Sequence, residues 1–210
     1  MNSSTSGGIH VVGICGSIRP GSYTRIALTE ALAGAAANGA VTQLIDLREY
    51  RLPFVTATDG PEQESADVVR LRSDVRSADG IILATPEYHG SFSGVLKNAI
   101  DLMGFEEFEG KMLGLVGVSG GRMGASDALN VLRSVGRALR AWVLPQQVSI
   151  PDASSVFDEG GHISDPRLGK RLRDTGALVA RFATVHKWAT ADEFVQLWQK
   201  APENPGGDAR

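Results

Sequence analysis

The chain has 210 residues, of which 42% are hydrophobic and 21% are charged, a composition typical of a folded globular protein. Its net charge of −3 predicts no basic surface of the kind that binds nucleic acid. A single cysteine excludes an intramolecular disulfide and a zinc site built from cysteines. No apolar run has the length of a membrane span, and the polar start lacks the apolar core of a signal peptide. We therefore expect a cytoplasmic protein without a nucleic-acid or membrane partner.

The first half of the chain alternates short apolar runs with helical patterns. Residues 1–8 predict a disordered leader. Ile9–Cys15 is short, β-branched and followed by a glycine-rich turn, which predicts a buried strand. An alanine-rich helix over residues 22–37 and a strand at Val41–Leu47 follow. Residues 61–78 predict the next helix, because proline suits its first position.

The second half continues this alternation. Its predicted strands and helices are, in order, the strand Gly80–Thr85, a helix over residues 91–103 that stops at Gly104, the strand Met112–Val118, a helix around residues 128–139, and the strand Ala141–Ile150, which we expect to bend near Pro145.

A long final helix is predicted to begin at Asp165 and Pro166. Its expected inner face carries Leu168, Leu172, Val179 and Ala183. Residues 201–210 predict a flexible tail, so residues 9–200 form the expected domain.

Strands that are almost continuously apolar and alternate with helices predict a parallel sheet covered on both faces. Five such units suit an α/β fold of the flavodoxin-like type, a three-layer sandwich around a five-stranded parallel sheet of order 2-1-3-4-5. Ligands of such sheets bind beyond the carboxyl ends of the strands. The loops after the first, third and fourth strands are therefore the candidate functional loops.

The first of these loops, Gly16–Thr24, enters a helix, and backbone N–H groups at a helix start favour an anion. Ser17, Ser22 and Thr24 add hydroxyl donors, and Arg19 adds a guanidinium suited to phosphate oxygens. A capped turn with a solvated arginine is the alternative interpretation of the same residues.

Several phosphate motifs are excluded in this loop. It lacks the lysine of a Walker P-loop, and Gly13 and Gly16 have the wrong spacing for a dinucleotide fingerprint. A cysteine phosphatase loop needs arginine where this chain has Gly21. Cys15 is therefore predicted to be a small buried strand residue, and the loop to hold a phosphate rather than transfer it.

The loops after the third and fourth strands also have unusual compositions. Thr85–Ser91 places an aromatic residue and a glycine at the end of a central strand, where they can frame a flat ring, although Tyr88 as packing and Glu87 as a surface charge remain alternatives. Ser119–Ala125 holds a glycine run that lets backbone N–H groups approach a ligand such as the pyrimidine edge of a flavin. A flexible turn is the alternative for that loop.

Two motifs make the sequence resemble the NADPH-dependent FMN reductases, a family that includes quinone, azo-dye and chromate reductases. The first is Gly16-Ser17-x-Arg19-x-x-Ser22. The second runs from Pro86 to Asp101 as Pro-Glu-Tyr-x-x-Ser-x-x-Gly-x-Leu-Lys-Asn-Ala-Ile-Asp. The resemblance covers roughly residues 9–150. It implies an oxidoreductase that passes hydride from NADPH or NADH through FMN to a small acceptor. The implied acceptor is a quinone, an azo compound, a metal oxyanion or free flavin. The resemblance also implies that the protein assembles as a homodimer or homotetramer.

The resemblance also implies which residues bind FMN. They are Ser17, Arg19, Ser22, Tyr23 and Thr24 at the phosphate, Pro86, Glu87, Tyr88, His89, Gly90 and Ser91 around the isoalloxazine, and Ser119, Gly120, Gly121 and Arg122 at the flavin edge. Many relatives have asparagine at the positions of Thr24 and His89. Thr24 can still donate to a phosphate, whereas His89 is expected to tune the flavin or touch the acceptor. No metal and no catalytic acid or base is assigned.

Three other functions remain open from the sequence. A flavodoxin-type electron carrier would dock to protein partners, although a net charge of −3 is small for docking through an acidic surface. A reductase that releases reduced flavin to a partner monooxygenase keeps the same chemistry. An interaction module without flavin is disfavoured by the intact Ser17, Arg19 and Ser22.

Overall fold

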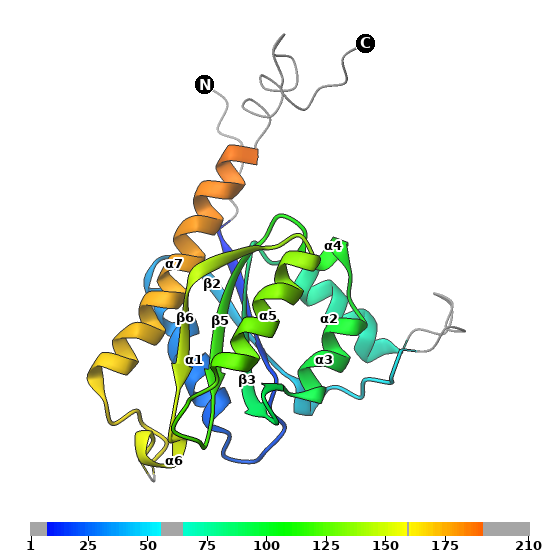
Figure 1. Cartoon of the computed structure of the whole chain (residues 1–210). Coiled ribbons are helices and arrows are strands. Elements are labelled where there is room, and N and C mark those ends of the chain that lie inside the picture. The colour runs from blue at the N-terminus through cyan, green and yellow to red at the C-terminus, as the bar shows by residue number, and fades with distance from the viewer. Residues whose placement is uncertain (1–7, 56–64, 159, 191–210) are drawn as a thin grey trace, which may run out of the picture.

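The computed structural model describes residues 8–55, 65–158 and 160–190, which form a parallel sheet between two layers of helices (Figure 1). The long strands are β1 (His10–Cys15), β2 (Val41–Asp46), β3 (Gly80–Tyr88), β5 (Met112–Val118) and β6 (Trp142–Ile150). They pair in parallel in the order β2-β1-β3-β5-β6. This confirms the predicted flavodoxin-like order of five parallel strands. The predicted strand count is wrong, because a two-residue strand, β4 (Ser91–Phe92), pairs antiparallel with β3.

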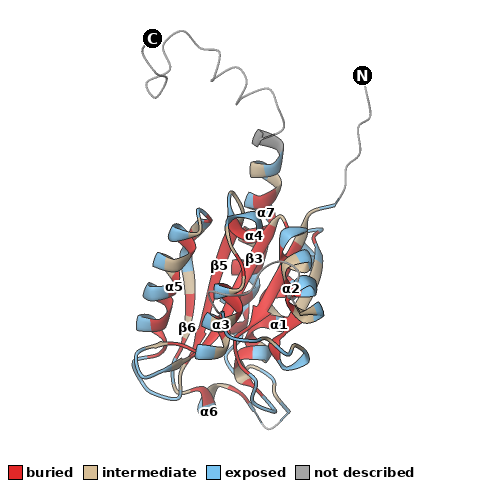
Figure 2. Ribbon diagram, turned by 90° about the vertical axis from the view of Figure 1, so that its right-hand side faces the viewer, coloured by how far each residue is buried: buried red, intermediate tan, exposed pale blue. Residues whose placement is uncertain are grey.

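Helices cover both faces of the sheet. One face packs against α1 (Tyr23–Ala37) and α7 (Pro166–Thr190), and the other against α2 (Ala66–Arg76), α3 (Gly94–Asp101) and α5 (Ser126–Ala138) (Figures 1 and 2). Three short helical turns complete the described chain, namely the 3₁₀ turn η1 (Leu47–Glu49), α4 (Phe105–Phe108) and α6 (Ala153–Val156).

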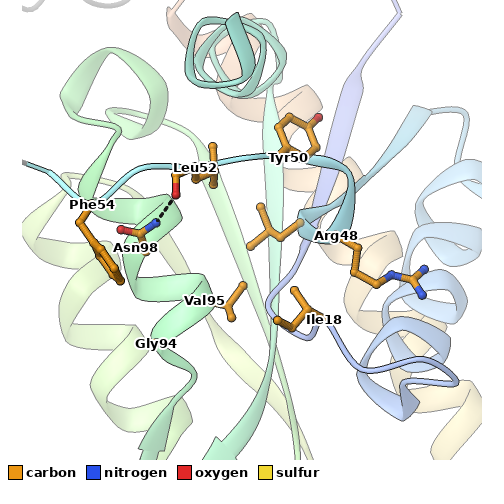
Figure 3. Close-up of a pocket in the computed structure, with 9 residues that line it drawn as sticks. Ile18, Arg48, Tyr50, Leu52, Phe54, Gly94, Val95 and Asn98 are labelled. Atoms are coloured by element: carbon orange, nitrogen blue, oxygen red, sulfur yellow. Dashed lines mark hydrogen bonds between the residues drawn. The ribbon is translucent and has the colours of Figure 1, made fainter. Parts of the chain in front are cut away.

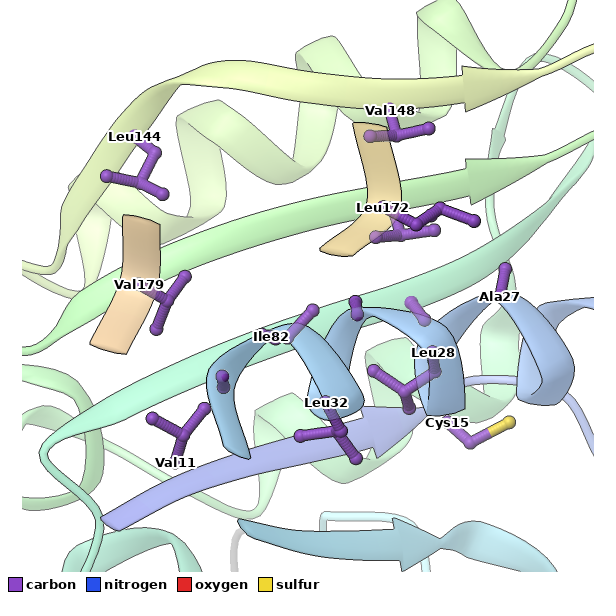
Figure 4. Packing of buried hydrophobic residues seen from close by; sticks show 14 of the residues in the cluster. Val11, Cys15, Ala27, Leu28, Leu32, Ile82, Leu144, Val148, Leu172 and Val179 are labelled. Atoms are coloured by element: carbon purple, nitrogen blue, oxygen red, sulfur yellow. The ribbon is translucent and has the colours of Figure 1, made fainter. Parts of the chain in front are cut away.

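The sheet is buried on both faces because successive strand residues point to opposite sides. In β1, Val11 and Cys15 contribute to the core under α1 and α7, whereas Val12 and Ile14 contribute to the core on the other face. Figure 4 shows the first of these cores, with side chains of α1 and α7 facing the strands. The predicted inner face of the final helix is confirmed, since its residues Leu168, Leu172, Val179 and Ala183 are all buried.

Two glycines let α1 and α7 approach each other closely. A Cβ atom at Gly34 would lie 2.0 Å from the Arg173 carbonyl oxygen, and one at Gly176 would lie 1.7 Å from the Ala31 carbonyl oxygen. Both distances are far shorter than van der Waals contact, so any side chain at either position would push the helices apart.

The predicted helix over residues 91–103 is wrong at both ends. Ser91 and Phe92 form β4, and α3 begins at Gly94 because the Ser93 hydroxyl accepts a hydrogen bond from the Leu96 N–H at 3.2 Å. The helix ends at Asp101, before the predicted stop.

The described part of α2 begins later than the sequence predicts. Its first residue is Ala66, after an extended Ser65 whose side chain accepts a hydrogen bond from the Val68 N–H. The predicted start at Pro61 lies outside the described residues. Of the predicted leader over residues 1–8, residues 1–7 lie outside them, and so does the predicted tail.

The predicted bend near Pro145 is confirmed as an irregularity in β6. Leu113 of β5 pairs with Val143, but Leu115 pairs with Gln147, so β6 has extra residues around Pro145. Such a bulge, with a proline, suits a strand at the edge of a sheet. Within the described ranges, the model has no helix that is both long and apolar enough for a membrane crossing.

A buried carboxylate joins α2 to the turn at α4. Glu107 is fully buried, and its side chain accepts hydrogen bonds from the Gly104 N–H at 2.7 Å, from Arg76 at 2.8 Å and from Arg72 at 3.3 Å. Burial alone raises the pKa of this carboxyl group. The three donors outweigh burial, and the pKa is lowered.

We predict that Glu107→Gln lowers the free energy of unfolding by about 2–4 kcal/mol at pH 7, because the partly exposed Arg72 and Arg76 lose a fully buried carboxylate as their partner. Urea unfolding measures this change, with the exposed neighbour Glu106→Gln as the matched control. A carboxyl group with a lowered pKa stabilises the fold above its unfolded pKa of about 4.3 and loses that effect as the pH falls. The difference between Glu107→Gln and the unaltered chain should therefore shrink below about pH 4. A difference that does not change with pH would contradict the charged role of Glu107.

Candidate functional site

The three predicted loops meet at the carboxyl ends of β1, β3 and β5, where they line a cavity of about 400 Å³. This cavity is called the loop cavity below. Its lining residues are Ser17, Arg19, Pro20, Gly21, Ser22, Tyr23, Thr24, Pro86, Glu87, Tyr88, Val118, Gly120, Ala153 and Ser154. The structure therefore brings together the predicted phosphate loop, the first half of the predicted ring loop and one glycine of the third loop.

The phosphate loop is held by hydrogen bonds that its own serine hydroxyl groups accept from backbone N–H groups. Ser22 caps α1, because its Oγ accepts a hydrogen bond from the Arg25 N–H at 3.4 Å. The Ser17 Oγ accepts one from the Arg19 N–H at 3.5 Å. Ser17, Ser22 and Thr24 are buried, yet all three line the loop cavity. These three residues thus surround a shared space at the start of a helix.

Arg19 differs from the other arginines at this end of α1. Arg25 and Arg48 both form ion pairs with the buried carboxylate of Asp46. In the part of the chain that the structure describes, the Arg19 guanidinium has no such partner, and the first turn of α1 has no acidic residue. Arg19 is exposed and lines the loop cavity, so its charge is free to meet an anion there.

Tyr23 connects the phosphate loop to the segment after β6. Its ring stacks on Phe157 with a centroid separation of 4.6 Å and an interplanar angle of 8°. Phe157 is buried and follows α6, whose residues Ala153 and Ser154 close the loop cavity. Tyr23 therefore lines the cavity with a ring that is already held by a neighbour.

The ring loop is a tight hairpin between β3 and β4. Tyr88 pairs with Ser91, and the two residues between them, His89 and Gly90, have φ angles of 52° and 73°. Positive φ at both central residues is typical of a type I′ turn, in which asparagine and glycine are favoured. His89, Gly90 and Ser91 stand at this tip and do not line the loop cavity. On backbone grounds, this turn therefore favours asparagine at position 89, where this chain has histidine.

Glu87 contacts two parts of the structure, since it lines the loop cavity and its side chain also reaches α5. Its Oε2 accepts a hydrogen bond from the Ala128 N–H at 3.0 Å. The N-cap of α5 is Ala125, which has no side chain to cap the helix. Glu87 therefore supplies a capping carboxylate from a different loop, and it fixes the ring loop to the helix that follows the third loop.

The third loop is held by several hydrogen bonds despite its glycines. The Ala153 N–H donates to the Ser119 carbonyl at 3.0 Å, and the Asp152 N–H donates to the Gly121 carbonyl at 3.2 Å. The Ser119 Oγ accepts from the Gly121 N–H at 3.1 Å. Gly120 lines the loop cavity, whereas Ser119, Gly121 and the exposed Arg122 do not. The loop is thus fixed to the start of α6 rather than free.

Two parts of the site were missed from the sequence. Residues 153 and 154 of α6 close the cavity, but a four-residue helix has no periodic pattern that would reveal it. The support of Tyr23 by Phe157 joins residues 134 positions apart, which no local signal indicates.

Cys15 lies directly before the phosphate loop and is fully buried. Burial raises the pKa of its thiol, and its Sγ donates to the Ser17 carbonyl at 3.6 Å. The prediction that Cys15 is a buried strand residue is confirmed, and a buried thiol with a raised pKa is a poor nucleophile.

Comparisons with known proteins agree with this architecture. A family model described as NADPH-dependent FMN reductase matches residues 9–155. An NAD(P)H-dependent FMN reductase of Pseudomonas aeruginosa is 36% identical over 177 residues, which cover 79% of this chain and 90% of that protein. An FMN-dependent NADPH-azoreductase of Staphylococcus aureus is 34% identical over 136 residues, which cover 62% of this chain and 72% of that protein.

Solved structures show the same fold at lower identity. A flavoenzyme NAD(P)H:(acceptor) oxidoreductase of Paracoccus denitrificans aligns with a TM-score of 0.67 at 22% identity, covering 85% of this chain and 98% of that one. A flavodoxin from the Archaea aligns with a TM-score of 0.58 at 12% identity, covering 83% of this chain and 98% of that one.

We predict that Glu87→Ala destabilises the chain by about 1–2 kcal/mol, because α5 loses the carboxylate that caps it. Glu87→Gln keeps an oxygen acceptor and should recover at least half of this loss. Urea unfolding of the FMN-free protein measures both changes. Asp127→Ala is the matched control, since Asp127 is an exposed acid in the first turn of α5 that makes no capping bond. Equal losses for Glu87→Ala and Asp127→Ala would show that charge near the helix start, and not the Glu87 contact, sets the effect.

Proposed function

Because the chain belongs to the NADPH-dependent FMN reductase family, we propose that its loop cavity binds FMN and that a small acceptor is reduced there. The family makes the chain an oxidoreductase that depends on FMN and NAD(P)H. The observation that carries the proposed site is the meeting of three loops from β1, β3 and β5 around one cavity. A volume of about 400 Å³ falls within the usual range for a small-molecule site.

The residues of the phosphate loop fit the phosphate of FMN. The buried residues Ser17, Ser22 and Thr24 line the cavity at the start of α1, and Arg19 brings a guanidinium that is not already paired within the described chain. The helix start and the guanidinium both favour a dianion. The one carboxylate that lines the cavity, Glu87, is turned to the Ala128 N–H and is thereby partly compensated.

The remaining loops fit the flavin ring. Pro86 and Tyr88 line the cavity from a hairpin with a tight turn, and Gly120 lines it with backbone that carries no side chain. Fixed N–H groups near a ring edge stabilise the negative charge that collects there on reduction. We assign Pro86, Glu87 and Tyr88 to the ring side, and Gly120 with its neighbours Ser119, Gly121 and Arg122 to the edge.

When bound, FMN supplies the hydride chemistry, accepting from the nicotinamide and donating to the acceptor. The protein contributes binding and orientation. Arg19 and the hydroxyl groups of the phosphate loop would hold the phosphate of FMN, and the ring loop would orient the flavin ring. Glu87 fixes the ring loop to α5. No side chain of the loop cavity has to exchange a proton in this scheme, which agrees with the lack of a predicted acid or base.

Names of relatives support small acceptors. The Staphylococcus aureus protein is called an azoreductase and the Pseudomonas aeruginosa protein an FMN reductase, so we propose an azo compound or free flavin as acceptor, with quinones and metal oxyanions as further members of the class. His89, Gly90 and Ser91 lie at the hairpin tip beside the cavity, where an acceptor would approach. A tuning role of His89 stays a prediction.

The electron-carrier alternative has less support, since the flavodoxin comparison shows the fold alone. A homodimer or homotetramer and a cytoplasmic location remain predictions, as does release of reduced flavin to a monooxygenase.

An anaerobic absorption spectrum before and after addition of NADPH tests the proposed function. We expect a yellow FMN-loaded protein whose flavin band bleaches without a partner reductase. A yellow protein that does not bleach would favour the electron carrier. A protein that stays colourless after FMN is supplied would refute the proposed site.

We predict that Arg19→Ala weakens FMN binding by roughly 2–4 kcal/mol, because the phosphate loses a charged hydrogen-bonded partner. A fluorescence titration of FMN measures the affinity. Arg181→Ala, at an exposed position of α7, removes the same charge away from the site and should leave the affinity unchanged. Equal affinities of the Arg19→Ala variant and the unaltered chain would remove Arg19 from the phosphate site.

A further inference from the structure

Three residues that do not line the loop cavity are joined by hydrogen bonds. They are Gly16, the first residue of the phosphate loop, Thr85, the first residue of the ring loop, and Ser93, the N-cap of α3. The Ser93 Oγ donates to the Gly16 carbonyl at 2.5 Å, and the Ser93 N–H donates to the Thr85 Oγ1 at 3.0 Å. Ser93 therefore bridges the two loops, and this set of contacts is called the serine bridge below.

The serine bridge is buried, and both of its hydroxyl groups have partners. Ser93 is 2% exposed and Thr85 is fully buried. The Ser93 Oγ also accepts from the Leu96 N–H at 3.2 Å, and the Thr85 Oγ1 donates to the Pro86 carbonyl at 2.8 Å. Each hydroxyl group thus donates one hydrogen bond and accepts another. A buried network whose members are all satisfied holds them in one arrangement, and Pro86 carries that arrangement to the wall of the loop cavity.

The backbone of Gly16 packs tightly against the elements that carry the bridge. Its N–H donates to the Ala84 carbonyl of β3 at 2.8 Å. A Cβ atom at this position would lie 2.8 Å from the Leu96 Cβ and 2.9 Å from the Ala84 carbonyl oxygen, both closer than van der Waals contact. The phosphate loop therefore begins in direct contact with β3 and with the first turn of α3.

Side-chain packing adds little to this junction further along the phosphate loop. Ser17 and Arg19 line the loop cavity, whereas Ile18 lines a second cavity of about 720 Å³, together with Gly94 and Val95 of α3 (Figure 3). Ile18 is 53% exposed, so its side chain is not buried against α3. The loop is therefore joined to α3 mainly at its first residue, where the serine bridge lies.

A ligand that contacts both loops needs them at a set distance. In the proposed site the phosphate loop holds the phosphate of FMN and the ring loop orients the flavin ring, and a chain of fixed length connects these two ends of FMN. Contacts at the two ends reinforce each other only when both loops already lie at the span of the ligand.

We propose that Ser93 is a positioning residue of the FMN site, which fixes the phosphate loop to the ring loop at the distance that FMN spans. This inference rests on the proposed function, because it concerns the cofactor of the same site. Ser93 acts through Gly16 and Thr85 and does not touch the ligand. Its loss should therefore weaken the contribution of the phosphate to binding more than that of the ring.

Fluorescence titrations of FMN and of riboflavin, with the full chain freed of bound flavin, separate the two contributions, because riboflavin has the same ring and no phosphate. Ser93→Ala should lower the preference for FMN over riboflavin by about 10-fold, since the phosphate loop loses a buried hydrogen bond. The affinity for riboflavin should stay close to that of the unaltered chain. A purely structural role of Ser93 would lower both affinities alike or change the stability alone.

Ser65→Ala is the matched control. It removes the hydroxyl group that caps α2 by accepting from the Val68 N–H at 3.3 Å, and it should keep the preference for FMN. Thr85→Val provides a second variant that keeps the side-chain volume and removes the acceptor of the Ser93 N–H. It should lower the preference in the same direction as Ser93→Ala does.

Three outcomes would overturn the proposal. They are a preference for FMN that Ser93→Ala leaves unchanged, an equal loss of affinity for both flavins, and a loss of the preference in Ser65→Ala as well. If Ser93→Ala does not fold, an unchanged preference in Thr85→Val overturns the proposal instead. Each of these outcomes leaves the proposed function standing if NADPH bleaches the flavin of the unaltered chain. An unaltered chain that binds no FMN refutes the proposed function itself.

Discussion

The close approach of α1 to α7 is the packing constraint on which the position of the site depends. Gly34 and Gly176 bring the two backbones into contact, and the alanines of α1 leave little side-chain volume between the helix and the sheet. Gly13 in β1 allows a third close contact, this one between the sheet and α1, since a Cβ atom there would lie 2.7 Å from the Leu28 side chain. With its axis fixed from both sides, α1 presents its capped start at one defined place beyond β1.

The sequence predicted most of the framework because buried parallel strands leave a strong local signal. The three inner strands β1, β3 and β5 are nearly continuous in apolar residues over their buried lengths, and the final helix shows its buried face through Leu172 and Val179. The error at residues 91–103 has a tertiary cause. The apolar period of α3 was visible, but Ser93 starts the helix because its N–H donates to the Thr85 Oγ1 at 3.0 Å and its hydroxyl to the Gly16 carbonyl. Such partners lie outside any sequence window.

The site was predictable to the extent that topology determines it. Carboxyl ends of neighbouring parallel strands must meet at one edge, so three loops with unusual compositions were expected to share a cavity. What the sequence did not show is which side chains are already engaged. Tyr23 stacks on Phe157, and Glu87 caps α5. Tyr23 was predicted as an FMN contact, and Glu87 as an FMN contact or a surface charge. Both side chains also support the loops that carry them.

Three arginines near the start of α1 also show that the sequence does not reveal which charged side chains are already paired in the fold. In the sequence Arg19, Arg25 and Arg48 are equivalent cations, and only the first falls in a recognisable motif. In the fold, Asp46 pairs with β1 at the level of Cys15, and its buried carboxylate takes Arg25 and Arg48 as partners. Arg19, which has no such partner among the described residues, is thereby left to the loop cavity. One carboxylate at the end of β2 thus separates two arginines that are held within the fold from the one that can meet an anion in the loop cavity.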